Sequence, residues 1–278
     1  MVKEKRVKEG IEKVVETIND SIPIIEWDFE GTHYFDNGPV TVQYLLVLDA
    51  LNFCFGLFIL DKDLSYYHLA LGLKAALQND KSVFDADCLQ KYTGSELWKW
   101  LILPRPLPLT DEQVRLLRGN FDGIASKLVE SCANPAVMLV ALPTCLFPGF
   151  CDHTVYKGHQ IFLYKRAQIF ASDLRGSFKG KGYGEFNDIG AITIFADYIV
   201  PAVLRQLGVL RYNSSLAGII EAKLELRACL IYAVEKMREL IWKKSGKQVL
   251  SVDLDLWLWS IGVECPSLQH RRTLSTYY

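Results

Sequence analysis

Residues 195–209 read Phe-Ala-Asp-Tyr-Ile-Val-Pro-Ala-Val-Leu-Arg-Gln-Leu-Gly-Val, and this stretch decides the expected fold. Asp197 stands four residues before Pro201, and an amphipathic helical pattern follows the proline. Since proline is tolerated in a first helical turn, we expect Asp197 at or just before a helix N-terminus, where free N–H groups favour an ionised carboxylate. Beside a sugar, such a carboxylate can stabilise an oxocarbenium-like transition state or position a water. The alternative is that Asp197 is only a helix cap.

Outward from this segment, most of the chain also has helical periodicity. Helices are expected at residues 2–19, 42–55, 64–78, 86–101, 111–130, 164–178, 192–210 (in two pieces), 215–244 and 251–262. Only residues 152–163 have the character of a strand. We therefore expect a mostly α-helical fold with few short strands, as one domain over residues 1–278 or as two helical lobes packed together.

Composition and charge disfavour several classes of protein. The 31 basic and 32 acidic residues give a net charge of -1, whereas a protein that binds polymeric DNA usually has an excess of Lys and Arg. The seven cysteines include no C-x-x-C pair, so we expect reduced thiols, no metal site and no cofactor. The first residues are charged, and no apolar run approaches the ~20 residues of a membrane span. These features predict a cytoplasmic protein.

The opening segment resembles the catalytic segment of the helix-hairpin-helix DNA glycosylases, in which an Asp opens the helix and is the catalytic carboxylate. The preceding glycine-rich stretch, residues 180–190, lacks the Gly-x-Gly pattern of their DNA-anchoring hairpin. The resemblance therefore implies a glycosylase-like helical fold that keeps the carboxylate of Asp197 and acts on a substrate smaller than DNA.

Several blocks in the same order resemble one family, the queuosine salvage proteins (queuosine 5′-phosphate N-glycosylase/hydrolases). These blocks are residues 48–55, 68–77, 164–169, 195–209 and 225–228. The resemblance implies hydrolysis of queuosine 5′-monophosphate to queuine and ribose 5-phosphate, with no metal. Two positions depart from the family pattern, which commonly has Trp at Gly56 and Arg at Ile199.

The resemblance assigns Asp197 as the catalytic residue and places base recognition in the apolar run at 42–55. Asp49 and Asn52 are polar groups three residues apart in the helix expected there, so we expect them to share a face. A buried carboxylate is costly without partners. Asp49 could accept both N–H donors of the 7-deazaguanine base, Asn52 could serve the carbonyl or the substituent, and Phe53 or Phe55 could stack on the ring. The alternative is an internal hydrogen bond between helices.

Other residues are candidates for the phosphate, the ribose and a lid. Lys165 is a compact positive charge that could contact the phosphate, with its neighbour Arg166 in a structural ion pair. Tyr198, beside Asp197, could bond the phosphate or the ribose. His33 could close over the ligand. The alternatives are a solvated face for the two cations and an ordinary loop for His33.

Three functions from different classes follow. The first is a nucleotide N-glycosylase on queuosine 5′-monophosphate, with a small-molecule substrate and neither a stable nucleic-acid partner nor a membrane. The second is a DNA-repair-type base glycosylase, which the neutral charge and the altered hairpin disfavour. The third is a non-catalytic queuine- or nucleotide-binding module, in which Asp197 would be a cap only.

Overall fold

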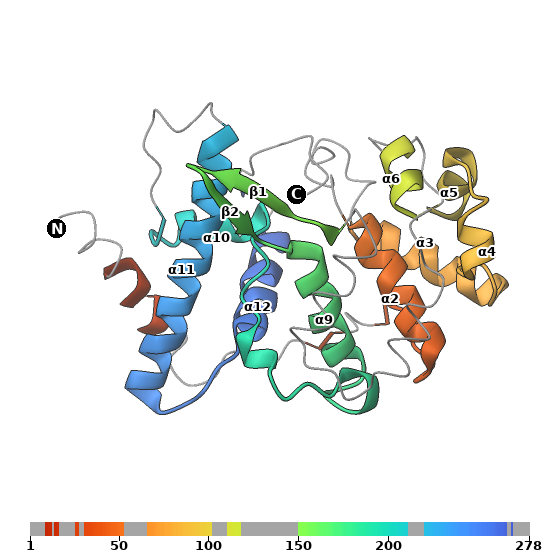
Figure 1. The fold of residues 1–278 in the computed structure, drawn as a ribbon. Coiled ribbons are helices and arrows are strands. Elements are labelled where there is room, and N and C mark those ends of the chain that lie inside the picture. The colour runs from red at the N-terminus through yellow and green to blue at the C-terminus, as the bar shows by residue number, and fades with distance from the viewer. Residues whose placement is uncertain are drawn as a thin grey trace. The chain divides into compact units, whose positions relative to one another are not determined.

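The computed structural model describes residues 9–12, 14–16, 26–27, 31–52, 66–101, 110–117, 150–210, 220–265 and 268 (Figure 1). Its helices are α2 (Pro39–Leu51), α3 (Tyr66–Asn79), α4 (Ala86–Leu89), α5 (Gly94–Leu101), α6 (Thr110–Leu117), α9 (Lys165–Ser177), α10 (Ile199–Gln206), α11 (Ile220–Ser245) and α12 (Ser251–Val263), with short 3-10 turns η3 (Gly182–Gly184) and η4 (Ile189–Ala191). Strands β1 (His153–Tyr156) and β2 (His159–Phe162) form the one sheet of the described residues. The expected mostly helical fold is confirmed. The likeness to DNA glycosylases stays a prediction.

The chain divides into two compact units. The first comprises Met1–Ile25, Val155–Ile161 and Gly190–Arg271, and it holds α10, α11 and α12. The second comprises Glu26–Thr154, Phe162–Ile189 and Arg272–Tyr278, and it holds α2 to α6 and α9. The expectation of a single domain over residues 1–278 stays a prediction.

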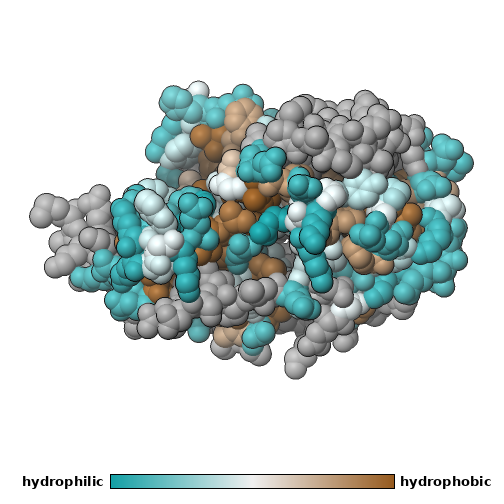
Figure 2. All heavy atoms as spheres, turned by 90° about the horizontal axis from the view of Figure 1, so that it is seen from below, coloured by the Kyte–Doolittle hydropathy of each residue, from teal (hydrophilic) through white to brown (hydrophobic). Residues whose placement is uncertain are grey.

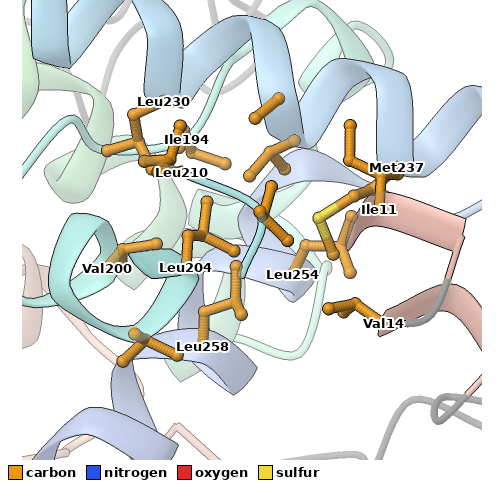
Figure 3. Close-up of a cluster of buried hydrophobic side chains, with 14 of the residues drawn as sticks. Ile11, Val14, Ile194, Val200, Leu204, Leu210, Leu230, Met237, Leu254 and Leu258 are labelled. Atoms are coloured by element: carbon orange, nitrogen blue, oxygen red, sulfur yellow. The ribbon is translucent and has the colours of Figure 1, made fainter. Parts of the chain in front are cut away.

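The first unit is built on apolar contacts among its three helices and the helical residues near the N-terminus. Figure 3 shows Val200 and Leu204 of α10 pointing toward Leu258 of α12. The other labelled side chains of this core are Ile11, Val14, Ile194, Leu210, Leu230, Met237 and Leu254. Burial of this apolar surface holds α10 in place, and α10 in turn carries the candidate catalytic segment.

Helix α10 ends in a glycine turn. Gly208 has a φ of +77°, and its N–H donates to the carbonyl of Arg205, while the N–H of Val209 donates to that of Leu204. This pair of bonds is the Schellman pattern, which requires a left-handed residue that glycine adopts without strain. A Cβ at Gly10 would lie 2.6 Å from the carbonyl oxygen of Gly208, so a second glycine allows the backbones to approach.

The second unit is centred on α2, which packs against α3, α6 and α9. Its residues from Tyr44 to Leu51 are all buried, which explains why the sequence there is apolar without an amphipathic period. The turn Asp36-Asn37-Gly38 precedes it. Asp36 accepts hydrogen bonds from the hydroxyl of Thr41 (2.7 Å) and from the backbone N–H groups of Gly38 (2.9 Å) and Thr41 (3.2 Å), and these bonds lower the pKa of its carboxyl.

Three expected helices differ from the structure. The one expected over residues 86–101 is two short helices, α4 and α5, separated by residues 90–93. The helix expected to run to residue 55 ends at Leu51, and Asn52 is its C-cap. Residues 192–198 precede α10 and are not helical, so residues 192–210 contain one helix and not two. Side chains from distant elements bond to the backbone before α10 and replace the helical hydrogen bonds there.

The surface of the described part is largely polar. Figure 2 shows one face, on which hydrophilic side chains make up much of the surface. Exceptions include Tyr232 and Trp242 on α11, which are 62% and 55% exposed. None of the described helices combines the length and the apolar character needed to cross a membrane.

Candidate active site

The carboxylate of Asp197 lies at the start of α10, as the sequence predicts. Its Oδ1 accepts hydrogen bonds from the backbone N–H groups of Ile199 (3.1 Å) and Val200 (2.9 Å), and the side chain is buried, with 7% exposure. These two donors are amides that the helix itself cannot satisfy. The carboxylate of Asp197 therefore caps the start of α10, and these two bonds fix its orientation.

Two buried charged side chains hold the segment that enters α10. Asp255 of α12 accepts a hydrogen bond from the backbone N–H of Phe195 at 3.0 Å, and Arg227 of α11 donates from Nε to the carbonyl of Ala196 at 2.9 Å. Buried backbone groups need such partners wherever they do not bond within a helix. This pair, the entry clamp, explains why residues 195 and 196 leave the helical pattern and fixes the position of Asp197.

The two residues after Asp197 differ in setting. Tyr198 is the N-cap of α10 and packs, partly buried, against the core of the first unit. Ile199 is buried in that core, where a Cβ at Gly262 would lie 2.2 Å from its Cγ2. Position 199, where the family pattern has Arg, is therefore a packing position in this chain. A substrate contact of Tyr198 stays a prediction.

Asp49 is the least satisfied polar group of the described structure. It is 0% exposed, and within the described part of the chain neither of its carboxylate oxygens has a hydrogen-bond partner. Burial raises its pKa well above the ordinary value, and the charge of Asp173 adds to this, whereas Arg166 and Lys165 act in the opposite direction. A carboxyl group in this state is poised to accept hydrogen bonds from a ligand.

Asn52 does not share a helical face with Asp49, because α2 ends at Leu51 and Asn52 has the backbone of a C-cap (φ −75°, ψ 71°). The prediction of a shared face was wrong, and a role for Asn52 now depends on the C-cap geometry. Phe53 and Phe55 lie outside the described residues.

Lys165 and Arg166 are both buried, with 5% and 2% exposure, so the alternative of a solvated face is wrong. Lys165 is the first residue of α9, and its backbone N–H donates to Oδ2 of Asp152 at 3.2 Å. The guanidinium of Arg166 donates to the carbonyl of Ala50 at 2.8 Å, one of the last carbonyls of α2. Both cations lie close enough to lower the pKa of Asp49.

His33 lies in an aromatic wall and not in an exposed lid, since it is 2% exposed and stacks on Trp27 with ring centroids 4.4 Å apart. Burial, aided by the charge of Lys74, lowers the pKa of its imidazole to about 4, so the ring is neutral at pH 7. The hydroxyl of Tyr44 donates to a backbone carbonyl at 3.2 Å and lies 3.1 Å from Nδ1 of His33. The hydroxyl of Tyr66 lies 3.5 Å from Nε2 of the same ring, so both ring nitrogens of His33 face tyrosine hydroxyls.

Asp173 is a residue that sequence reasoning did not place in the site. It lies on α9, partly buried, and burial raises its pKa to about 7, although the nearby indole of Trp27 acts in the other direction. Trp27 packs against α9 one turn further on, where a Cβ at Gly176 would lie 2.8 Å from its side chain. The second unit thus brings together Asp49, Asp173 and Lys165.

The first unit carries Asp197 and Tyr198. Asp255 and Arg227 of the same unit bond to the backbone of the two residues before Asp197. The sequence contains a signal that could have identified Asp255 as a functional residue. Asp255 is a charged residue within the apolar run of α12, as Asp49 is within the apolar run of α2. Arg227 lies in one of the family blocks. Among the described residues there is no group of three His, Cys, Asp or Glu side chains that could hold a metal ion.

Comparison with known proteins gives one consistent result. Residues 32–278 match the family model described as queuosine salvage protein. A relative from Dictyostelium discoideum, named queuosine 5′-phosphate N-glycosylase/hydrolase, is 41% identical over 258 residues, which is 86% of this chain and 78% of the relative. A relative of the same name from Sphaerobacter thermophilus is 35% identical over 91% of this chain and 85% of its own length. The chain therefore belongs to the queuosine salvage protein family.

Proposed function

We propose that this chain hydrolyses the N-glycosidic bond of queuosine 5′-monophosphate and releases queuine and ribose 5-phosphate. The observation that carries the proposal is the carboxyl of Asp49, which is fully buried and has two oxygens without a partner among the described residues. Leaving such a group unsatisfied costs free energy, which a ligand with matching donors recovers. The names of the relatives supply the substrate.

In the proposed reaction, the bond between C1′ of the ribose and the base nitrogen breaks, and its electron pair leaves with the base. Positive charge develops on C1′ and the ring oxygen, and the carboxylate of Asp197 stabilises it. Oδ1 is held by the amides of Ile199 and Val200, which fixes the carboxylate that we assign to the contact with the sugar or the attacking water. The water oxygen then bonds to C1′, and the base is protonated as it leaves.

The base and the phosphate are assigned to different groups. A 7-deazaguanine ring presents an N–H and an amino group on one edge, and the two oxygens of Asp49 match these two donors. Lys165 is the cation proposed for the 5′-phosphate, since a buried ammonium gives a strong charge-assisted contact. His33, Asn52 and Tyr198 remain candidates for the rest of the nucleotide.

The proposal is tested by incubating the protein with queuosine 5′-monophosphate and following the free base by mass spectrometry. We expect release of queuine, and slower release from unphosphorylated queuosine by about 10- to 150-fold, the equivalent of one charge-assisted contact of roughly 1.5–3 kcal/mol. Lys165→Ala should remove most of this difference between nucleotide and nucleoside.

The same assay separates the other two functions. A binding module would bind queuine without releasing it from the nucleotide, and a repair enzyme would release base from a damaged DNA duplex added in its place. If the nucleoside and the nucleotide are cleaved equally well, the phosphate assignment of Lys165 is wrong.

A further inference from the structure

Asp173 places a second carboxyl group beside the one proposed to recognise the base. Asp49 comes from α2 and Asp173 from α9, two helices that pack against each other, and the charge of Asp173 raises the pKa of Asp49. Two carboxylates together in a buried setting repel each other and lose hydration. If positions 49 and 173 served only to pack α2 against α9, a neutral residue at either position would make the folded state more stable. The presence of both carboxyl groups therefore points to a role in binding.

The surrounding contacts hold Asp173 in this place. Arg166, two helical turns before it on the same face of α9, is anchored on the carbonyl of Ala50, next to Asp49 in α2. One turn after it, Gly176 receives the ring of Trp27, which is stacked on His33. The carboxyl of Asp173 therefore belongs to the same wall as the aromatic cluster, and unlike Asp49 it keeps partial exposure.

The chemistry of the ligand suggests what a second carboxylate contacts. The two ring donors of queuine suffice for Asp49. Queuine also carries its cyclopentenediol on an aminomethyl link, and the secondary amine in this link is protonated at neutral pH. A cation near the two carboxyl groups relieves their mutual repulsion, which a further neutral donor does less well.

We propose that Asp173 binds the protonated secondary amine of the queuine substituent and thereby makes this cation a requirement for good substrates. The inference rests on the proposed function. It predicts discrimination against guanosine 5′-monophosphate, which presents the same donors to Asp49 but has no cation for Asp173. Buried polar groups left without a partner reject an analogue strongly.

The test compares nucleotides that differ only at the 7-position of the ring. 7-Aminomethyl-7-deazaguanosine 5′-phosphate carries a cation, whereas the 7-cyano analogue is neutral and of similar size. The native protein should cleave the 7-aminomethyl nucleotide with a kcat/KM at least about 10-fold above that of the 7-cyano nucleotide. In Asp173→Asn, kcat/KM for queuosine 5′-monophosphate and the 7-aminomethyl nucleotide should fall at least about 10-fold, and that for the 7-cyano nucleotide should stay within about twofold.

Asp87→Asn is the matched control, because it removes the same charge from an exposed position on α4 of the same unit, and it should change neither ratio. An equal loss of kcat/KM on charged and neutral substrates in Asp173→Asn, or no loss at all, overturns the inference. Calorimetric binding of free queuine and 7-cyano-7-deazaguanine to both proteins should show the same selectivity without turnover. If the native protein releases base from none of these nucleotides yet binds queuine selectively through Asp173, the proposed reaction fails while the amine contact stands.

Discussion

Two aspartates of this protein sit in opposite surroundings. Asp197 is bound by two backbone amides at a helix start, an arrangement that favours the carboxylate. Asp49 is enclosed and unsatisfied, so burial raises its pKa in the empty site, and donors from a bound base would stabilise its carboxylate. The environment of each group thus suits a different role, since Asp197 opposes positive charge on a sugar and Asp49 takes up hydrogen bonds from a base.

Substitutions at Asp197 should separate its capping role from its catalytic role. Asp197→Asn keeps an oxygen for the amides of Ile199 and Val200 but removes the charge, so base release should fall to near background while the free energy of unfolding changes little. Asp197→Ala removes both and should also cost about 0.5–2 kcal/mol of stability. Denaturant unfolding and base-release assays on both variants check this. Full turnover in Asp197→Asn would sink the mechanism.

Asp173 should make stability depend on pH in a defined window. Its pKa is about 7 in the folded protein against an ordinary 3.8, so between these values the folded state binds more protons than the unfolded state, and stability falls as pH rises. Asp173→Asn removes this penalty. Its melting temperature should exceed that of the native protein at pH 8, and the difference should shrink toward zero as pH falls to about 4.

Thermal unfolding of both proteins from about pH 4 to pH 8 measures this difference. A gain that is the same at all pH values would mean that the effect comes from packing and not from the charge of Asp173. A variant Asp173→Asn that is more stable at pH 8 but cleaves the charged substrates more slowly would show that Asp173 lowers stability and improves substrate recognition.

Among the elements, the segment that enters α10 depends most on distant partners. α11 and α12 each send one buried charged side chain to its backbone, Arg227 to Ala196 and Asp255 to Phe195. A buried segment without helical or sheet bonds otherwise has unsatisfied N–H and C=O groups. Because α11 and α12 pack against α10 and also bond to the backbone just before Asp197, the entry clamp fixes the position of Asp197.

Asp255→Ala should therefore lower kcat by about 10-fold or more with a much smaller change in KM, because the substrate still binds while Asp197 is displaced. Asp255→Asn keeps an acceptor for the N–H of Phe195 and should restore most of kcat. Asp253→Asn, on the same helix, is the control for a simple change of charge. A role in stability alone predicts instead that kcat per folded molecule is unchanged in Asp255→Ala.

For the whole molecule, selectivity has to come from the ligand site, because the net charge of -1 provides no general attraction for nucleic acid. A ligand that binds only the folded state raises its stability by mass action, by about 2.7 kcal/mol at 100 times the dissociation constant. The melting temperature is therefore a readout of recognition that does not require turnover.

Queuine should raise the melting temperature of the native protein, and guanine at the same concentration should not. Asp49→Ala should abolish the shift with queuine, because it removes both acceptors of the ring donors. Differential scanning fluorimetry with a queuine titration measures the effect. A shift of equal size with guanine, or one that survives in Asp49→Ala, would move base recognition to another part of the protein.

The sequence by itself determined the features that depend on near neighbours along the chain. Helical periodicity located most of the helices, and the spacing of Asp197 from Pro201 located the start of α10. Ordered blocks of sequence also identified the family. These signals are local because periodicity and capping act over one or two helical turns.

Only the tertiary structure decided which polar groups are left without partners and which are held in place. The desolvation of Asp49, its coupling to Asp173 and the burial of Lys165 depend on the packing of α2 against α9, which lie more than a hundred residues apart. The loss of helix before α10 likewise depends on Arg227 and Asp255. Burial and electrostatic coupling are set by groups close in space, and local patterns in the sequence do not encode which distant residues become neighbours.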